Sequence, residues 1–188
     1  MTRLMTTLTG ASLLVFSSLV CAAVPEGWSA NGSALSDYSV ATDKAVTYQG
    51  HPSVAIASKN ANSTGFAGLM QMISADDYKG KRVRLAAYLK TRDVAGGGAH
   101  LWFRVDGTNG KVLGFDNMYS RPVRGTTAWT KYEIVLDVPE DSTALAYGFF
   151  LNGGGVAWAT SFGLEVVSDS VPTTSRWPTH PTNLNFDQ

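Results

Sequence analysis

Period-two alternation of apolar side chains is the feature that most limits how this chain can fold. It is clear over residues 83–90, 101–106, 131–138 and 145–152, where every second side chain is apolar. Because successive side chains of a β-strand point to opposite faces, each run predicts a strand with one buried face. Between Trp28 and Val167 no stretch of about ten residues shows helical periodicity. The sequence therefore predicts an all-β domain.

Turn signals separate these runs, as expected where successive strands are antiparallel neighbours. They lie at Gln49-Gly50, Lys79-Gly80-Lys81, Gly96-Gly97-Gly98, Thr108-Asn109-Gly110 and Gly153-Gly154-Gly155. Roughly eight to ten short strands joined by such turns are typical of a β-sandwich or a barrel. Apolar residues make up 44% of the 188-residue chain and charged residues 16%, so the chain can bury a sizeable core. We predict a single antiparallel β-sandwich.

The first 23 residues are typical of a secretory signal peptide. A short basic start at Met1–Arg3 precedes an uncharged stretch that is strongest over Leu13–Val20. Cys21-Ala22-Ala23 then supplies small residues of the kind that a signal peptidase recognises, so we predict cleavage after Ala23. The mature protein would be periplasmic or secreted, with no membrane attachment. An uncleaved anchor is the alternative, but the apolar stretch is short for crossing a bilayer.

The mature chain divides into two parts. Residues 24–167 carry the predicted strands and form the expected domain. Residues 168–188 are rich in proline and lack alternation, which predicts an extended C-terminal tail. Cleavage would remove Cys21, the only cysteine, so the mature protein would have neither a disulfide nor a catalytic thiolate.

Several classes of function are disfavoured by what the sequence lacks. Lys+Arg and Asp+Glu both number 15, so there is no net charge to attract nucleic acid or anionic lipid. The three histidines, His51, His100 and His180, have no metal-ligand spacing and no cysteine partner. There is no Gly-x-Ser-x-Gly motif for a nucleophilic serine. We therefore predict no metal site, no cofactor and no nucleic-acid partner.

One hairpin can be predicted in detail. Residues 101–107 and 111–118 flank Thr108-Asn109-Gly110, a three-residue loop that ends in glycine and is a favoured hairpin connection. With this loop Phe103 lies opposite Phe115 on the buried face. A slip by one residue would bring a carboxylate onto that face instead, so the apolar pattern favours the first register.

This register brings a polar and aromatic set together on the opposite face. Val105 then lies opposite Leu113 inside, while Trp102 lies directly across from Asp116 outside, beside Arg104. A sugar is bound when an aromatic ring stacks on its C–H face and polar side chains bond its hydroxyls. The candidate ligand-binding residues are Tyr88, Lys90, Trp102, Arg104, Asp106 and Asp116, with Gln71 and Asn117 at the edges.

Two other interpretations of this face remain open. Arg104 and Asp116 could form a cross-strand ion pair while Trp102 only covers the sheet surface. Asp106 and Asp116 could instead be the paired carboxyls of a glycoside hydrolase or lyase, which need a separation of about 5 to 9 Å. Asp106, however, begins a turn, where aspartate is common for local hydrogen bonding.

The run from Gly27 to Val167 resembles a bacterial jelly-roll domain of the galactose-binding-like, carbohydrate-binding-module type. The resemblance is carried by Phe66–Gln71, Asp77–Val83, Leu101–Gly107, Phe115–Met118, Gly125–Trp129 and Tyr132–Pro139. It implies a jelly-roll sandwich of the kind found alone or appended to exported enzymes. Related modules often hold a structural calcium ion with an acidic pair in the last strand. Thr160 and Ser161 stand there in this chain, which argues against calcium.

These observations lead to three functional hypotheses. The first is an exported, non-catalytic module that recognises an oligosaccharide or a polysaccharide through the polar and aromatic face. The second is a structural or protein-interaction domain of the bacterial envelope, with an envelope protein as its partner and no sugar ligand. The third is a jelly-roll hydrolase or lyase. We expect the first, and no enzymatic activity.

Overall fold

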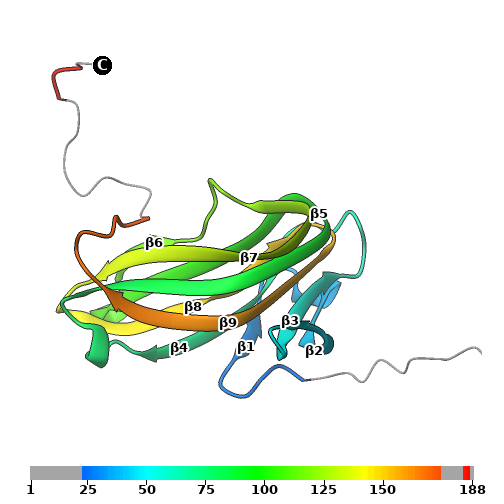
Figure 1. Cartoon of the computed structure of the whole chain (residues 1–188), viewed down its shortest axis with the longest axis horizontal. Coiled ribbons are helices and arrows are strands. Elements are labelled where there is room, and N and C mark those ends of the chain that lie inside the picture. Colours follow the sequence, from blue (N-terminus) through cyan, green and yellow to red (C-terminus); the bar gives the residue numbers. More distant parts are fainter. Residues whose placement is uncertain (1–22, 175–183, 187–188) are drawn as a thin grey trace, which may run out of the picture.

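The computed structural model describes residues 23–174 and 184–186, and these residues are folded almost entirely as β-strands (Figure 1). The strands are β1 (Ser29–Asn31), β2 (Tyr38–Tyr48), β3 (His51–Ser58), β4 (Phe66–Ser74), β5 (Lys81–Gly107), β6 (Val112–Asp116), β7 (Val123–Val138), β8 (Ser142–Asn152) and β9 (Val156–Val167). Short 3₁₀ turns lie at Leu35–Asp37, Asp76–Tyr78 and Thr108–Gly110, and the described residues contain no α-helix. The all-β prediction is confirmed. None of the helical segments described is long and apolar enough to cross a membrane.

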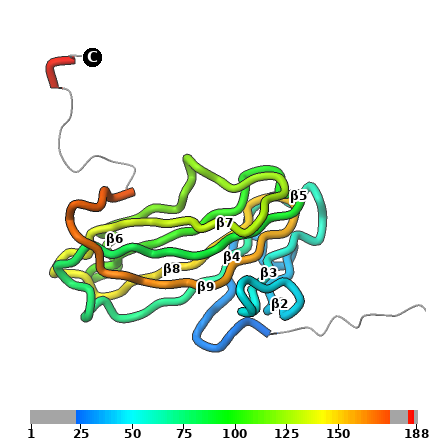
Figure 2. Tube along the Cα trace, in the orientation of Figure 1, coloured from blue at the N-terminus to red at the C-terminus, as the bar shows by residue number. Residues whose placement is uncertain are grey.

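A single antiparallel sheet folds over on itself into two layers, and β5 belongs to both of them (Figures 1 and 2). The first part of β5 pairs with β7 and β9, and the part from Gly98 onward pairs with β6 and β8. We call the layer of β1, β4, β8, the second part of β5 and β6 the β8 layer. The layer of β2, β3, β9, the first part of β5 and β7 is the β9 layer. This arrangement is the predicted jelly-roll sandwich.

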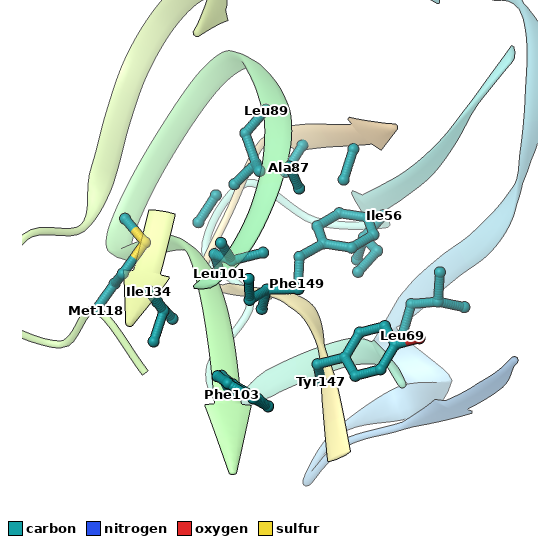
Figure 3. Close-up of a cluster of buried hydrophobic side chains, with 14 of the residues drawn as sticks. Ile56, Leu69, Ala87, Leu89, Leu101, Phe103, Met118, Ile134, Tyr147 and Phe149 are labelled. Atoms are coloured by element: carbon teal, nitrogen blue, oxygen red, sulfur yellow. The ribbon is translucent and has the colours of Figure 1, made fainter. Parts of the chain in front are cut away.

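The core lies between the two layers and follows the alternation seen in the sequence. The inward side chains of β5 come from both layers, among them Leu85 and Leu89 before the bend and Leu101 and Phe103 after it, all fully buried. Phe149 of β8 packs among them (Figure 3). Burying one such side chain stabilises the fold by about 1.5 to 3 kcal/mol. The two halves of β5 therefore bind the layers together through one shared core.

The glycine turn at residues 153–155 packs against the bend of β5. The backbone N–H of Ala95 donates to the carbonyl of Gly154, 3.1 Å away. Gly155 has φ of +105°, and a Cβ there would lie 2.6 Å from the carbonyl oxygen of Asp93. Positive φ and backbone contact of this kind admit only glycine. The turn at 153–155 thus fits against the bend of β5 because it carries no side chains.

Residues 169–174, which follow β9, pack on the domain. The N–H of Thr174 donates to the carbonyl of Val135 on β7, 2.9 Å away. Arg82 donates to the carbonyls of Asp169 and Val171 at 2.6 and 2.7 Å. The predicted signal peptide lies outside the described residues except for Ala23, and the predicted tail is described only over 168–174 and 184–186. The domain limits at 24 and 167 stay predictions.

We predict that Gly155→Ala lowers the free energy of unfolding by about 2 to 4 kcal/mol, because strain at positive φ adds to backbone overlap. Urea denaturation would measure it. Gly125→Ala is the matched control, since Gly125 has φ of +71° with nothing within 4 Å of its added Cβ. It should cost only about 1 kcal/mol. Equal costs for the two variants would contradict the role of close packing at this turn.

Candidate functional site

The hairpin of β5 and β6 pairs one residue away from the predicted register. Phe103 lies opposite Asp116, Arg104 opposite Phe115 and Val105 opposite Gly114. The alignment shifts at a bulge between Val105 and Asp106. The predicted pairs of Phe103 with Phe115, Val105 with Leu113, and Trp102 with Asp116 are therefore wrong.

Asp116 tolerates the inward position because its carboxylate has partners. Oδ1 accepts from the N–H of Met118 at 2.8 Å, and Oδ2 accepts from Nη2 of Arg121 at 2.7 Å. Asp116 is only 8% exposed, whereas Phe115 turns outward and is 46% exposed. A buried polar group that keeps its hydrogen bonds costs little, so the apolar pattern alone did not fix the register. Asp116 does not share the outer face with Trp102.

Three of the predicted residues, Trp102, Arg104 and Asn117, do come together on the outer face of the β8 layer. They line a groove of about 660 Å³ between β4, β8, β5 and the segment after β6. The full lining is Asn31, Gly32, Ser33, Phe66, Met70, Trp102, Arg104, Phe115, Asn117, Tyr119, Phe150 and Asn152. An aromatic hollow with a few polar groups is the usual form of a small-molecule or glycan site.

The groove exists because the middle of the outer face carries almost no side chains. Gly148 of β8 lies in register between Trp102 of β5 and Met70 of β4. The next outward position along β8 is Ala146, opposite Arg104. A Cβ on Gly148 would collide with the carbonyl of Leu69, so this position admits only glycine without a shift of the strands. Larger side chains on both sides then form the walls.

Aromatic rings make up most of these walls. The rings of Phe66 and Phe150 lie 5.6 Å apart at 64°. Trp102 is 9% exposed and forms part of the floor, and its indole N–H has no acceptor among the described residues. Tyr119, 74% exposed, and Phe115 present their rings to solvent at the other side. The groove therefore combines aromatic faces with a free donor.

The charged part of the groove is one ion pair. Nη2 of Arg104 donates to Oδ2 of Asp106 at 2.9 Å, and Nε lies 2.8 Å from Oδ1 without the alignment of a hydrogen bond. The two residues are on one face of β5 because they are two positions apart. A second hollow of about 570 Å³, lined also by Met72 and Val112, adjoins the groove and shares Arg104 with it.

A hollow of about 850 Å³ lies beyond β6, between the hairpin and the segment at Thr174. It shares Phe115, Asn117 and Tyr119 with the groove. Its charged groups, Asp116 and Arg121, are bound to each other. The side chains of Phe115 and Tyr119 thus lie between the groove and this hollow and line both of them.

Tyr88 and Lys90 lie on the opposite side of the molecule from the groove. They belong to the first part of β5, where Tyr88 pairs with Thr160 and Lys90 with Trp158 in the β9 layer. The ring of Tyr88 stacks on that of Tyr48 at 4.1 Å. The prediction that they share a face with Trp102 is wrong, because β5 changes layer between the two sets.

Gln71 and Asp106 also depart from the predicted arrangement. Gln71 is on the inner phase of β4, where its side chain accepts from the hydroxyl of Tyr147 and donates to the carbonyl of Gly27 at 3.3 Å. It does not line the groove. Asp106 is on the outer phase but Asp116 is on the inner one, so the two carboxylates do not face each other across a cleft. The premise of the glycosidase hypothesis is therefore wrong.

Nine of the twelve lining residues were not predicted for the groove, and five of these have large side chains: Phe66, Met70, Phe115, Tyr119 and Phe150. Phe150 offered a signal, since it is an aromatic residue on the phase of β8 opposite the buried one. One such residue is ordinary, but several that lie side by side on an outward phase indicate a binding surface. Phe66 and Met70 lie on the outward phase of β4 in the same way. Tyr119 follows β6 in a loop and carried no periodic signal.

Nothing described resembles a metal centre. Residues 23–174 and 184–186 hold no group of three or more His, Cys, Asp or Glu that could bind a metal ion. At the position that the resemblance linked with calcium, the hydroxyl of Thr160 donates to the carbonyl of Pro52 at 2.7 Å. The expectation that a structural calcium is possible but doubtful stays a prediction.

His100 contacts two of the residues that line the groove, Phe150 and Asn117. Its ring stacks on Phe150 at 4.4 Å and 6°, and its two nitrogens lie 3.1 and 3.2 Å from the carbonyls of Asn117 and Gly97. Burial lowers the pKa of His100, while these carbonyls act in the opposite direction. His100 therefore joins the loop that carries Asn117 to the ring of Phe150.

No protein-family model matches the chain. A curated relative from Bacillus subtilis strain 168, the uncharacterized HTH-type transcriptional regulator YbfP, is 40% identical over 169 residues. The match covers 87% of this chain and 57% of that protein, so the chain spans a little over half of the relative's length.

Three solved structures place the fold. Tailspike protein 4 of bacteriophage CBA120, in its enzymatically active domain, has a TM-score of 0.54 at 14% identity, covering 76% of this chain and 20% of that one. A family 16 carbohydrate-binding module has 0.53 at 14%, covering 74% and 91%. The C-terminal family 22 module of Clostridium thermocellum Xyn10B has 0.50 at 11%, covering 78% and 89%. The predicted jelly-roll fold and its likeness to carbohydrate-binding modules are confirmed, and at these identities the likeness concerns the fold alone.

We predict that His100 makes stability fall as the pH drops below about 6.5, the ordinary value for histidine. Because the pKa of His100 is lower in the folded state, the unfolded chain binds the proton more readily. The contribution of His100 to the free energy of unfolding is therefore fully present above pH 6.5, and it decreases as the pH falls from 6.5 to the pKa of the folded state. The measurement is Tm from pH 8 to 5 for the wild type and for His100→Gln. The variant should have a shallower slope below 6.5, and parallel slopes would contradict this role.

Proposed function

We propose that this protein is a non-catalytic module that binds a carbohydrate in the groove on the outer face of the β8 layer. One observation carries the proposal: aromatic rings and a few polar groups surround a floor that Gly148 keeps free of side chains. The family 22 module of Xyn10B, which has the same fold, is described as having a cleft with amino acids that act in ligand binding. That likeness supports a cleft as the binding site here.

The groove has the chemistry that sugar recognition needs. The exposed rings of Phe115 and Tyr119 can stack on the C–H faces of a sugar ring. The indole N–H of Trp102, the amide of Asn117 and the guanidinium of Arg104 can bond its hydroxyl groups. These polar groups are few and lie on rigid strands or at their ends, which favours recognition of a defined ligand.

The positions of the carboxylates support binding without catalysis. A glycosidase needs two carboxyl groups across the bound sugar. Asp106 is the acidic side chain beside the groove, and it is paired with Arg104. Asp116 is buried on the inner face against Arg121. We therefore propose that the chain is not an enzyme.

We also propose that the chain is exported, because residues 1–23 are typical of a signal peptide. The relative is named as a transcriptional regulator, which supports a second role as part of a regulator. We propose that in this role the groove senses a small saccharide. The described residues of this chain contain no α-helix, so they cannot supply a helix-turn-helix. Export and sensing make different predictions about the mature N-terminus.

If the chain is exported, expression with its native start in a bacterial host will yield a periplasmic or secreted product that begins at Val24. N-terminal sequencing of the fractionated protein measures this. A product that keeps Met1 and stays with the cytoplasmic fraction would favour the sensing role instead.

We predict that Phe115→Ala with Tyr119→Ala weakens glycan binding at least tenfold, which is about 1.4 kcal/mol. Both rings are well exposed, so the free energy of unfolding should change by less than about 1 kcal/mol. Affinity electrophoresis on a polysaccharide panel, followed by titration with xylohexaose, measures the loss. Trp102→Ala is a poorer test because this indole is 9% exposed and its removal would leave a cavity.

Tyr88→Ala provides the matched control for these variants. It removes an aromatic ring from the outer face of the β9 layer, away from the groove. Binding should therefore be unchanged. Loss of binding in Tyr88→Ala, with retention in the Phe115 and Tyr119 variant, would move the site to the other face and refute the proposal.

A further inference from the structure

The groove and the hollow that adjoins it hold one positive and one negative side chain among the described residues. These are Arg104 and Asp106, and all the other lining side chains are neutral. The second charged pair on this surface, Arg121 with Asp116, lies in the hollow beyond β6 and is closed by its own contact at 2.7 Å. The net charge that a ligand meets in the groove therefore depends on Arg104 and Asp106.

The geometry of this pair leaves little positive charge for an anionic ligand. Both Nε and Nη2 of Arg104 lie within 2.9 Å of carboxylate oxygens of Asp106. The side chain of Asp106 is 13% exposed and that of Arg104 is 34% exposed, so the carboxylate lies beneath the guanidinium. Where water is partly excluded, a second carboxylate at the guanidinium would be repelled by Asp106 at short range.

An uncharged sugar meets no such repulsion. Nη1 of Arg104 has no acceptor among the described residues and can donate to a hydroxyl group. The carboxylate of Asp106 keeps the guanidinium in position on β5 while it does so. The pair therefore favours a hydroxyl-bearing ligand over a carboxylate-bearing one.

We propose that Asp106 restricts the groove to neutral glycans by neutralising Arg104, and that it is the specificity-determining residue against uronic acids. This inference rests on the proposed function. Replacement of Asp106 by its neutral isostere would release the positive charge of Arg104 towards the groove and admit glycans that carry carboxylates.

The test compares two matched pairs of probes. One is xylan with and without uronic acid side groups, and the other is a soluble β-1,4-glucan before and after oxidation of its C6 hydroxyls to carboxylates. The wild type should bind the neutral form at least tenfold more tightly. Asp106→Asn should bring this ratio to about one or reverse it, with a gain that high salt removes. Arg104→Gln in the same chain should abolish the gain.

Two further variants keep the test decisive. Asp137→Asn breaks the ion pair with Arg82 away from the groove, and it should leave the ratio unchanged. If Asp106→Asn fails to fold, Thr143→Lys adds a positive charge at an exposed position beside Asp106 and should shift the ratio in the same direction.

The outcomes separate the two proposals. Equal or tighter binding of the carboxylated form by the wild type would overturn the role of Asp106 and leave glycan binding standing. An unchanged ratio in Asp106→Asn, with the variant folded, would overturn it as well. Binding of neither form by the wild type would overturn the proposed function together with this inference.

Discussion

The change of layer within β5 is the constraint on which the rest of the structure depends. One strand of 27 residues supplies the centre of both layers, so its bend decides which side chains can meet. Outward side chains before the bend belong to the β9 layer, and those after it belong to the β8 layer. The bend is held against the turn at 153–155, where the backbones approach too closely for any Cβ. The bend places Trp102 and Arg104 in the β8 layer, where they line the groove.

The strands and the core could be predicted because period-two alternation is a local property of the sequence. The bend could not, since alternation continues on both sides of it and nothing local indicates whether two runs belong to one layer. Alternation alone therefore predicts that Tyr88 and Lys90 share a face with Trp102, although pairing with β9 places them on the other side. The predicted register of the β5–β6 hairpin is wrong for another reason. The apolar pattern disfavours an inward carboxylate, but the carboxylate of Asp116 accepts hydrogen bonds from Arg121 and from the backbone N–H of Met118.

The groove combines two features that sequence alone presents separately. Small residues on the outward phase of β8, Ala146 and Gly148, leave the middle of the face low. Large residues on the outward phase of the neighbouring strands, such as Phe66 and Met70, form walls around it. A small residue on the outward phase of a strand does not by itself predict a groove. It becomes informative only when the register places it between larger ones, and register depends on long-range pairing.

Fold cannot decide what this groove binds, because the same jelly roll occurs in a phage tailspike and in carbohydrate-binding modules, at 11–14% identity to this chain. Aromatic walls select for sugars in general but discriminate weakly among them, since any pyranose presents C–H groups to a ring. Charge discriminates more strongly, because an unfavourable charge in a partly dry site cannot be relieved by a small shift of the ligand. In this groove the charge is set by the contact between Arg104 and Asp106 on one face of β5. We propose that this contact, more than the shape of the hollow, decides which ligand binds.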